Sequence, residues 1–178
     1  VDTANSTKTI NDYFVVSTWY VTPEHDLLLY DVYRTHIEGP DQKPLMKEMR
    51  GRYRPRFQAV ENKTFGTNLI QEMRREGMTV RPVNVDTDKV TRSLVIAARY
   101  EVGQVWHRQD APWLTEYEDE LLSFPRGKHD DQVDTASMAG EIIHALPPVD
   151  RDDMRKTPAQ RFDEDEDEDE SNTYEGFW

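Results

Sequence analysis

The sequence predicts an α/β fold in which a mixed β-sheet is flanked by helices. Two apolar segments rich in Val and Tyr, separated by a short turn, indicate a β-hairpin near the start of the chain. Helical and strand patterns alternate after it, as in crossover units. Because a hairpin is antiparallel and a helical crossover joins parallel strands, the two patterns together predict a mixed sheet.

The strands are predicted from β-branched and aromatic residues and from the turns that bound them. The turn Thr22-Pro23-Glu24-His25 separates the first two strands, and the third strand is short and apolar and ends in a carboxylate. The last strand is short enough to be an edge strand. The predicted strands cover residues 13–20, 26–34, 57–61, 78–83 and 104–106.

The helices are predicted from apolar spacing and from the residues that end them. Leu69, Ile70 and Met73 have the spacing of a buried helical face, and Gly77 follows as a stop signal. The last helix is expected to end before Pro147, because proline cannot continue a helix. The predicted helices cover residues 44–53, 67–76, 89–102, 113–122 and 133–146.

The composition excludes several classes of protein. The 178 residues include no Cys, which excludes disulfide scaffolds, thiol nucleophiles and thiolate zinc sites. No apolar run approaches the roughly 18 residues of a membrane span, and the first residues do not resemble a signal peptide. Any metal ion must therefore be held by oxygen or histidine.

The acidic residues are concentrated at the C-terminal end. Residues 147–178 contain 12 acidic and 4 basic residues and so carry −8 of the formal charge of −13. The run from Asp163 to Glu170 is uninterrupted acid, which repels itself and stays extended. We therefore expect a folded domain over residues 1–146 and a disordered acidic tail over 147–178. Aromatic residues near the end of the tail leave open a docking role.

Three acidic motifs lie where the chain is expected to change direction. Asp2 follows what looks like the end of a strand, Glu61 ends another strand, and Asp130, Asp131 and Asp134 enter the last helix. Ligands of open α/β sheets bind at the ends of strands. Hard divalent cations such as Mg²⁺ prefer oxygen ligands, and two ions about 4 Å apart can activate water and stabilise the leaving oxygen of a phosphodiester.

Each motif also has a purely structural interpretation. Glu61 could pair with Lys63, and Asp130 or Asp131 could cap the last helix. His129 is a weak zinc candidate, because the five histidines include no His-x-x-x-His pair. Neither a Gly-x-Ser-x-Gly elbow nor a Walker A motif occurs, so acyl hydrolysis and an ATPase within this chain are not expected.

Taken together, the motifs resemble one known family. The segments are VDTANSTKTINDYFVV, AVENKTFGTNLIQEMRREG, VDTDKVTRSLVIAARYEVGQVW and FPRGKHDDQVDTASMA. In this order they resemble the nuclease domain of the large terminase subunit of tailed bacteriophages, over roughly residues 1–145. The resemblance implies a fold like RNase H and RuvC. It also implies cutting of double-stranded DNA during viral genome packaging, dependent on Mg²⁺ or Mn²⁺, with two ions expected.

The resemblance assigns the candidate site residue by residue. It implies that Asp2, Glu61 and Asp131 are the catalytic metal carboxylates. Asp130 competes with Asp131 for the role of direct ligand, and Asp134, three residues beyond Asp131, supports the site. Asp12 is a further, weaker candidate. The family often has Asp where this chain has Glu61, which is longer by one methylene.

DNA binding requires basic groups, because contacts to phosphate dominate affinity. Basic residues crowd into residues 47–56, and further ones flank the acidic motifs or open the helix at residues 89–102. No base-reading element is identifiable, so little sequence preference is expected. The DNA-binding candidates are Arg50, Arg52, Arg54, Lys63, Lys89, Arg92 and Lys128.

The resemblance also implies partners and a location. The partners are double-stranded DNA, an ATPase motor domain preceding Val1, the portal and the small terminase subunit, and no membrane is involved. The expected location is the host cell cytoplasm during virion assembly. Two alternatives remain open: a resolvase or transposase-like nuclease of the same fold, and a non-catalytic docking domain that acts through its acidic tail.

Overall fold

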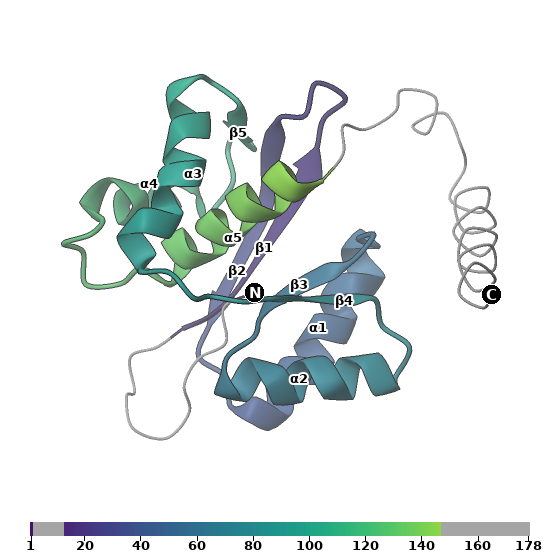
Figure 1. Ribbon diagram of the computed structural model, residues 1–178. Coiled ribbons are helices and arrows are strands. Elements are labelled where there is room, and N and C mark those ends of the chain that lie inside the picture. Colours follow the sequence, from purple (N-terminus) through teal and green to yellow (C-terminus); the bar gives the residue numbers. More distant parts are fainter. Residues whose placement is uncertain (2–12, 147–178) are drawn as a thin grey trace, which may run out of the picture.

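The computed structural model describes residue 1 and residues 13–146 (Figure 1). The described strands are β1 (Phe14–Val21), β2 (Leu27–Thr35), β3 (Gln58–Glu61), β4 (Val80–Val83) and β5 (Val105–His107). The described helices are α1 (Gly39–Tyr53), α2 (Thr64–Arg75), α3 (Lys89–Glu101), α4 (Leu114–Ser123) and α5 (Asp131–Ala145). Every predicted element is present, and the predicted α/β class is confirmed.

The strands form one three-stranded group and one pair. β1 and β2 make an antiparallel hairpin, and β5 pairs in parallel with the other edge of β2. β3 and β4 are parallel and are joined by α2, as expected for a helical crossover. The described strands therefore mix both pairing directions, as the sequence predicted.

The backbone of Val1 lies beside β3. The Val1 nitrogen donates to the carbonyl of Ala59 at 2.9 Å, and the Glu61 nitrogen donates to the carbonyl of Val1 at 3.2 Å. The next backbone nitrogen of the chain, that of Asn62, donates instead to the carbonyl of Val83, the last residue of β4. Because alternate residues of a strand bond to opposite sides, Val1 lies on the edge of β3 away from β4.

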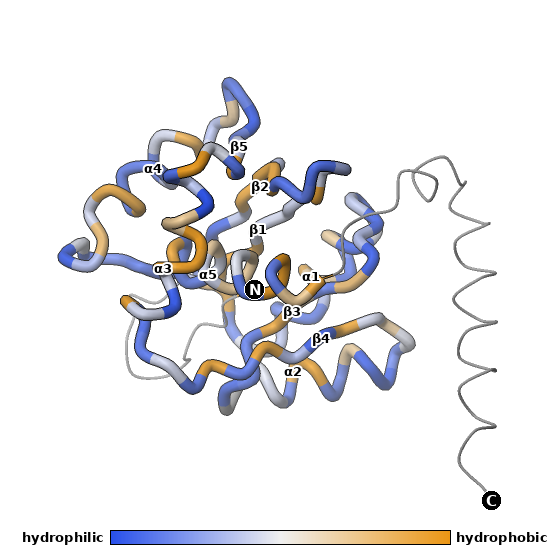
Figure 2. Tube along the Cα trace, turned by 45° about the horizontal axis from the view of Figure 1, so that its top comes forward, coloured by the Kyte–Doolittle hydropathy of each residue, from blue (hydrophilic) through white to orange (hydrophobic). Residues whose placement is uncertain are grey.

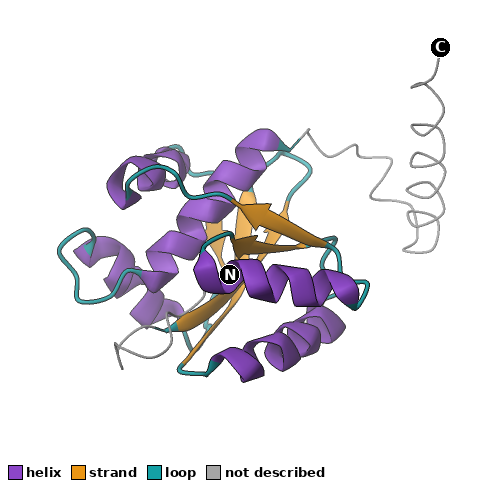
Figure 3. Ribbon diagram, turned by 60° about the horizontal axis from the view of Figure 1, so that its bottom comes forward, coloured by secondary structure: helices purple, strands orange, loops and turns teal. Residues whose placement is uncertain are grey.

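Helices cover both faces of the strands (Figures 1 and 3). α1 and α2 pack on one face around Phe14, Val16 and Met73, and α3, α4 and α5 pack on the other with Val15 in their cluster. Successive residues of β1 thus enter opposite cores, as the two-residue period of a strand requires. The hydrophobic stretches lie mostly on helices and strands, whereas many connecting turns are hydrophilic (Figure 2).

α3 and α5 approach each other closely at Gly140. A Cβ atom at this position would lie 3.1 Å from the Cβ of Ile96 and 3.2 Å from its backbone nitrogen. A larger residue would push the two helices apart. The contact matters for the site because the first turns of both helices carry its charged side chains.

Three helices begin earlier than the sequence predicted. α1 begins at Gly39, five residues before Pro44, which lies inside the helix. Proline is tolerated there because it lies near the N-terminal end, where it removes only one intrahelical bond. α2 begins at Thr64 and α5 at Asp131, so Asp131 is the first helical residue and Asp130 the N-cap.

The predictions for two segments lie outside the described residues. These segments are residues 2–12, which include Asp2 and Asp12, and the acidic residues 147–178. Within the described part of the chain, α5 ends at Ala145, close to the predicted end of the folded domain. None of the described helices is both long and apolar enough to cross a membrane.

Candidate functional site

Glu61 ends β3 with a nearly buried carboxylate. Its side chain is 5% exposed, and its Oε1 atom lies 2.7 Å from the ammonium of Lys63. The predicted ion pair between these residues is therefore present. The backbone nitrogen of Glu61 donates to the carbonyl of Val1, the residue that precedes Asp2 in the sequence.

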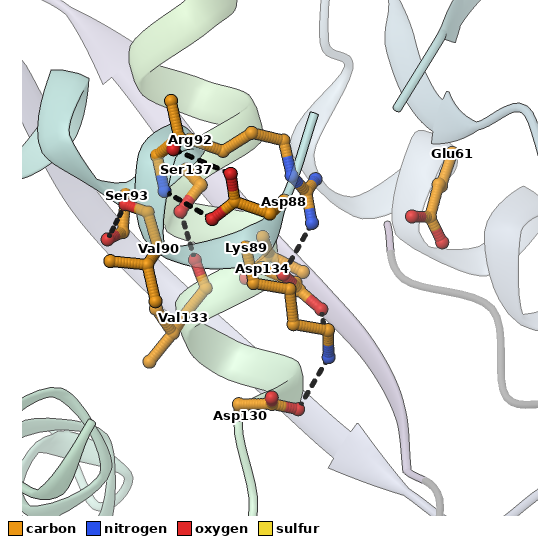
Figure 4. Close-up of polar contacts among 12 residues, drawn as sticks. Glu61, Asp88, Lys89, Val90, Arg92, Ser93, Asp130, Val133, Asp134 and Ser137 are labelled. Atoms are coloured by element: carbon orange, nitrogen blue, oxygen red, sulfur yellow. Dashed lines mark hydrogen bonds and ion pairs between the residues drawn. The ribbon is translucent and has the colours of Figure 1, made fainter. Parts of the chain in front are cut away.

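Lys89, the first residue of α3, bridges two acids of the third motif. Its Nζ atom lies 2.8 Å from Oδ1 of Asp130 and 2.9 Å from Oδ2 of Asp134 (Figure 4). Asp130 and Asp134 come from the N-cap and the first turn of α5. One ammonium group thus contacts oxygens of two carboxylates. A bound metal cation also requires oxygens from several ligands.

The acids around Lys89 change its protonation. Partial burial alone would lower the pKa of Lys89, but hydrogen bonds to Asp130 and Asp134, together with their charges, outweigh it and raise that pKa above its ordinary value. Lys89 is therefore an ammonium ion throughout the neutral range. Its charge compensates part of the negative charge that the two carboxylates bring together.

Asp88 fixes the start of α3 and hence the position of Lys89. Its carboxylate accepts from the backbone nitrogen of Thr91 at 3.0 Å and from the Thr91 hydroxyl at 2.6 Å. These two hydrogen bonds lower the pKa of Asp88. Such a cap satisfies donors that the first turn of a helix leaves free.

Arg92 lies one turn further along α3 and faces Asp134. Its Nη2 atom lies 2.8 Å from Oδ1 of Asp134, and the two side chains are 2% and 7% exposed. Arg92 was predicted to contact DNA, but in this conformation it faces a buried carboxylate and not the surface. Asp134 is held by both Arg92 and Lys89.

Asp131 opens α5, and its side chain is 13% exposed. Arg34 lies at the end of β2, and its Nη2 atom is 4.0 Å from Oδ2 of Asp131. Arg34 stacks 3.7 Å above the ring centroid of Tyr13. The predicted pair therefore divides: Asp130 is bound to Lys89, whereas Asp131 faces Arg34.

Sequence reasoning missed Glu120, a buried acid of α4. Its carboxylate accepts from the backbone nitrogens of Gln132 and Val133 and from the side-chain amide of Gln132. A signal was present, because Glu120 falls in line with Trp113 and Tyr117 on the buried side of α4. A carboxylate at an apolar position of a helix indicates a specific partner.

Apart from Arg92, which pairs with Asp134, the predicted DNA-binding residues separate into two groups. Lys63 and Lys89 pair with acids of the motifs, and Lys128 is exposed two positions before Asp130. The remaining three arginines lie at the C-terminal end of α1, which leads into the start of β3, whereas Glu61 ends β3. A strand of 4 residues spans about 13 Å, so the arginine segment and Glu61 lie at opposite ends of β3. These arginines are Arg50, Arg52 and Arg54.

The donor chemistry of the acidic residues fits a hard divalent cation. Every candidate ligand is a carboxylate, and ammonium groups occupy positions beside Glu61, Asp130 and Asp134 that a cation would take. Within the described residues no three His, Cys, Asp or Glu side chains converge closely enough to hold a metal ion. Figure 4 likewise shows Glu61 apart from the group around Lys89.

Helices on both faces of mixed strands, with acids at strand and helix ends, define a mixed α/β domain. The family model described as the terminase RNaseH-like domain matches residues 1–141. The chain therefore belongs to the terminase RNaseH-like family, as its motifs indicated. A comparison with curated proteins found no significant match.

Proposed function

We propose that this domain is a divalent-metal-dependent endonuclease that cuts double-stranded DNA during viral genome packaging. The observation that carries the proposal is the Lys89 ammonium, held between carboxylate oxygens of Asp130 and Asp134. Carboxylate oxygens are the ligands that Mg²⁺ takes in proteins, so we expect a metal ion to replace the ammonium at these carboxylates. Membership of the terminase RNaseH-like family supports the same conclusion.

In this proposal Asp2, Glu61 and Asp131 bind the catalytic metal ions, with Asp130 and Asp134 beside them. Mg²⁺ or Mn²⁺, as a pair of ions, would supply an activated water and stabilise the leaving oxygen of the phosphodiester. The carboxylates place negative charge where the ions bind. Support for Asp2 comes from its sequence neighbour Val1, which is hydrogen-bonded to Glu61.

The lysines of the site have two successive roles in the proposed reaction. Lys63 and Lys89 neutralise the carboxylates before a metal ion binds, because unpaired buried carboxylates are costly. Once displaced by metal, their exposed ammonium groups, with that of Lys128, are free to contact phosphates of the DNA strand. Phosphate contacts carry no sequence information, so cutting has little sequence preference.

The proposed setting is packaging in the host cell cytoplasm. There the domain works with an ATPase motor domain, the portal and the small terminase subunit. The motor supplies DNA, and the nuclease domain cuts it. These partners are inferred from the family alone. Binding of this chain to the purified motor domain, portal and small terminase subunit tests them.

Cleavage of plasmid and linear duplex DNA tests the proposed reaction. We expect nicking and linearisation with Mg²⁺ or Mn²⁺ and none after metal removal with excess EDTA. Glu61→Gln should be inactive. Glu72→Gln changes an exposed acid of α2 that is paired with Lys43 of α1, and this variant should cut normally. Full activity without metal would contradict the mechanism, and a strong preference for branched DNA would favour a resolvase.

A further inference from the structure

The beginning of α5 lacks the cap that its sequence suggests. The first backbone nitrogens of a helix have no partner within the helix, and an Asp at the N-cap normally accepts from them. Asp130 occupies the N-cap, but among the described residues its side chain makes no capping hydrogen bond. Its carboxylate is bound to Lys89 instead.

Glu120 caps α5 from a different helix. Its Oε1 atom accepts from the backbone nitrogen of Gln132 at 2.6 Å and from that of Val133 at 3.2 Å. Its Oε2 atom accepts from Nε2 of Gln132 at 2.8 Å. The Glu120 side chain is 5% exposed, so water cannot readily replace these bonds.

The guanidinium group of Arg34 lies close to both Glu120 and Asp131. Its Nη2 atom lies 3.6 Å from Oε2 of Glu120 and 4.0 Å from Oδ2 of Asp131. Arg34 also pairs with the exposed Glu116 of α4. Glu120 therefore contacts the site in two ways: it accepts from the backbone of α5, and it lies beside the Arg34 guanidinium group that faces Asp131.

We infer that Glu120 is a positioning residue, which caps α5 so that the carboxylate of Asp130 stays available for a cation. Without Glu120, the two donors at Gln132 and Val133 would be buried without an acceptor. Asp130 lies at the N-cap, the position from which an Asp side chain normally accepts from these donors. Its carboxylate would then turn back to cap the helix and leave the site. The role as a cation site rests on the proposed function.

The test uses Mn²⁺ alone as the probe, with the full chain. Binding is titrated by electron paramagnetic resonance at a temperature where circular dichroism shows each variant folded. Glu120→Ala should weaken Mn²⁺ binding about 10- to 100-fold, the usual effect of losing a residue that orients metal ligands. Glu116→Gln is the matched control, since it changes another α4 partner of Arg34 that is 65% exposed, and should leave Mn²⁺ affinity within about twofold.

Amide hydrogen exchange separates this inference from the proposed function. The amides of Gln132 and Val133 should exchange faster in Glu120→Ala, or in Glu120→Gln if the alanine variant does not fold. Unchanged exchange would overturn the capping role, and unchanged Mn²⁺ affinity with faster exchange would overturn the positioning role. If the wild-type chain binds no Mn²⁺, both the proposed function and the positioning role are wrong. Faster exchange of the Gln132 and Val133 amides in the Glu120 variant would still establish the cap.

Discussion

Arg92 of α3 and Asp134 of α5 form a buried ion pair, with 2.8 Å between Nη2 and Oδ1. It joins the first turns of the two helices that carry Lys89 and Asp130. Removing one partner of such a pair leaves the other charge buried without compensation. The pair therefore links the stability of the domain to the geometry of its candidate site.

Replacing Arg92 by Met should lower the free energy of unfolding by about 3 kcal/mol, measured by urea denaturation. The expected loss is at the low end for a buried pair because Lys89 still contacts Asp134. Lys43→Met, at an exposed pair with Glu72, should cost less than about 1 kcal/mol. The double variant of Arg92→Met and Asp134→Leu should lose less than the sum of the single changes, and strictly additive losses would contradict the coupling.

The carboxylates should behave as one unit in catalysis. Asp2→Asn, Glu61→Gln and Asp131→Asn should each nearly abolish DNA cutting in a chain that remains folded by circular dichroism. Combined changes should add little, because each single change already disables the shared metal site. Asp119→Asn, at an exposed position of α4, serves as the control. Normal cutting by Asp131→Asn, with none by Asp130→Asn, would show that Asp130 is the direct ligand.

The arginine segment at the end of α1 tests how far bound DNA extends from the site. The double change of Arg52 and Arg54 to Ala should weaken duplex binding equally across sequences. Each lost phosphate contact should reduce the slope of log affinity against log salt by about 0.9. Fluorescence anisotropy at several salt concentrations measures this slope. An unchanged slope would confine the DNA to the opposite end of β3, beside Lys63.

Removal of the acidic residues tests whether they compete with DNA. α5 has 15 residues and is about 22 Å long, so Ala145 at its end lies far from Asp131 at its start. Truncation after Val149 should increase duplex binding and cutting at low salt, and the gain should shrink as salt screens the charges. A chain with Asn and Gln in place of the acids at 163–170 is the control of equal length. Equal activity of all three chains at low salt would exclude competition.

Much of the fold was predictable because it depends on local patterns. The apolar residues of β1 and the turn at Thr22 indicated the hairpin, and Gly77 marked the end of α2. The start of α1 was wrong by five residues, because Pro44 resembles a first-turn proline although Pro40 occupies that position. Two of the acidic motifs were identified for the same reason, since Glu61 ends β3 and Asp131 opens α5.

The rest depends on contacts between distant elements. Glu120 and Gln132 are 12 residues apart and meet only because α4 and α5 pack together. Arg92 looks like an exposed cation in the sequence, and only the packing of α3 on α5 shows that it is buried. Likewise, the separation of Arg52 from Glu61 follows from the direction in which α1 returns to β3, which a linear pattern does not contain.

A structure of the chain with bound Mn²⁺ tests the central claim most directly. Anomalous scattering would locate the ions without reference to any activity. The account predicts Mn²⁺ at the oxygens of Glu61 and Asp131, with the Lys63 and Lys89 ammonium groups moved away from their carboxylate partners. Absence of Mn²⁺ from these carboxylates at saturating concentration, with both lysine pairs intact, would contradict it.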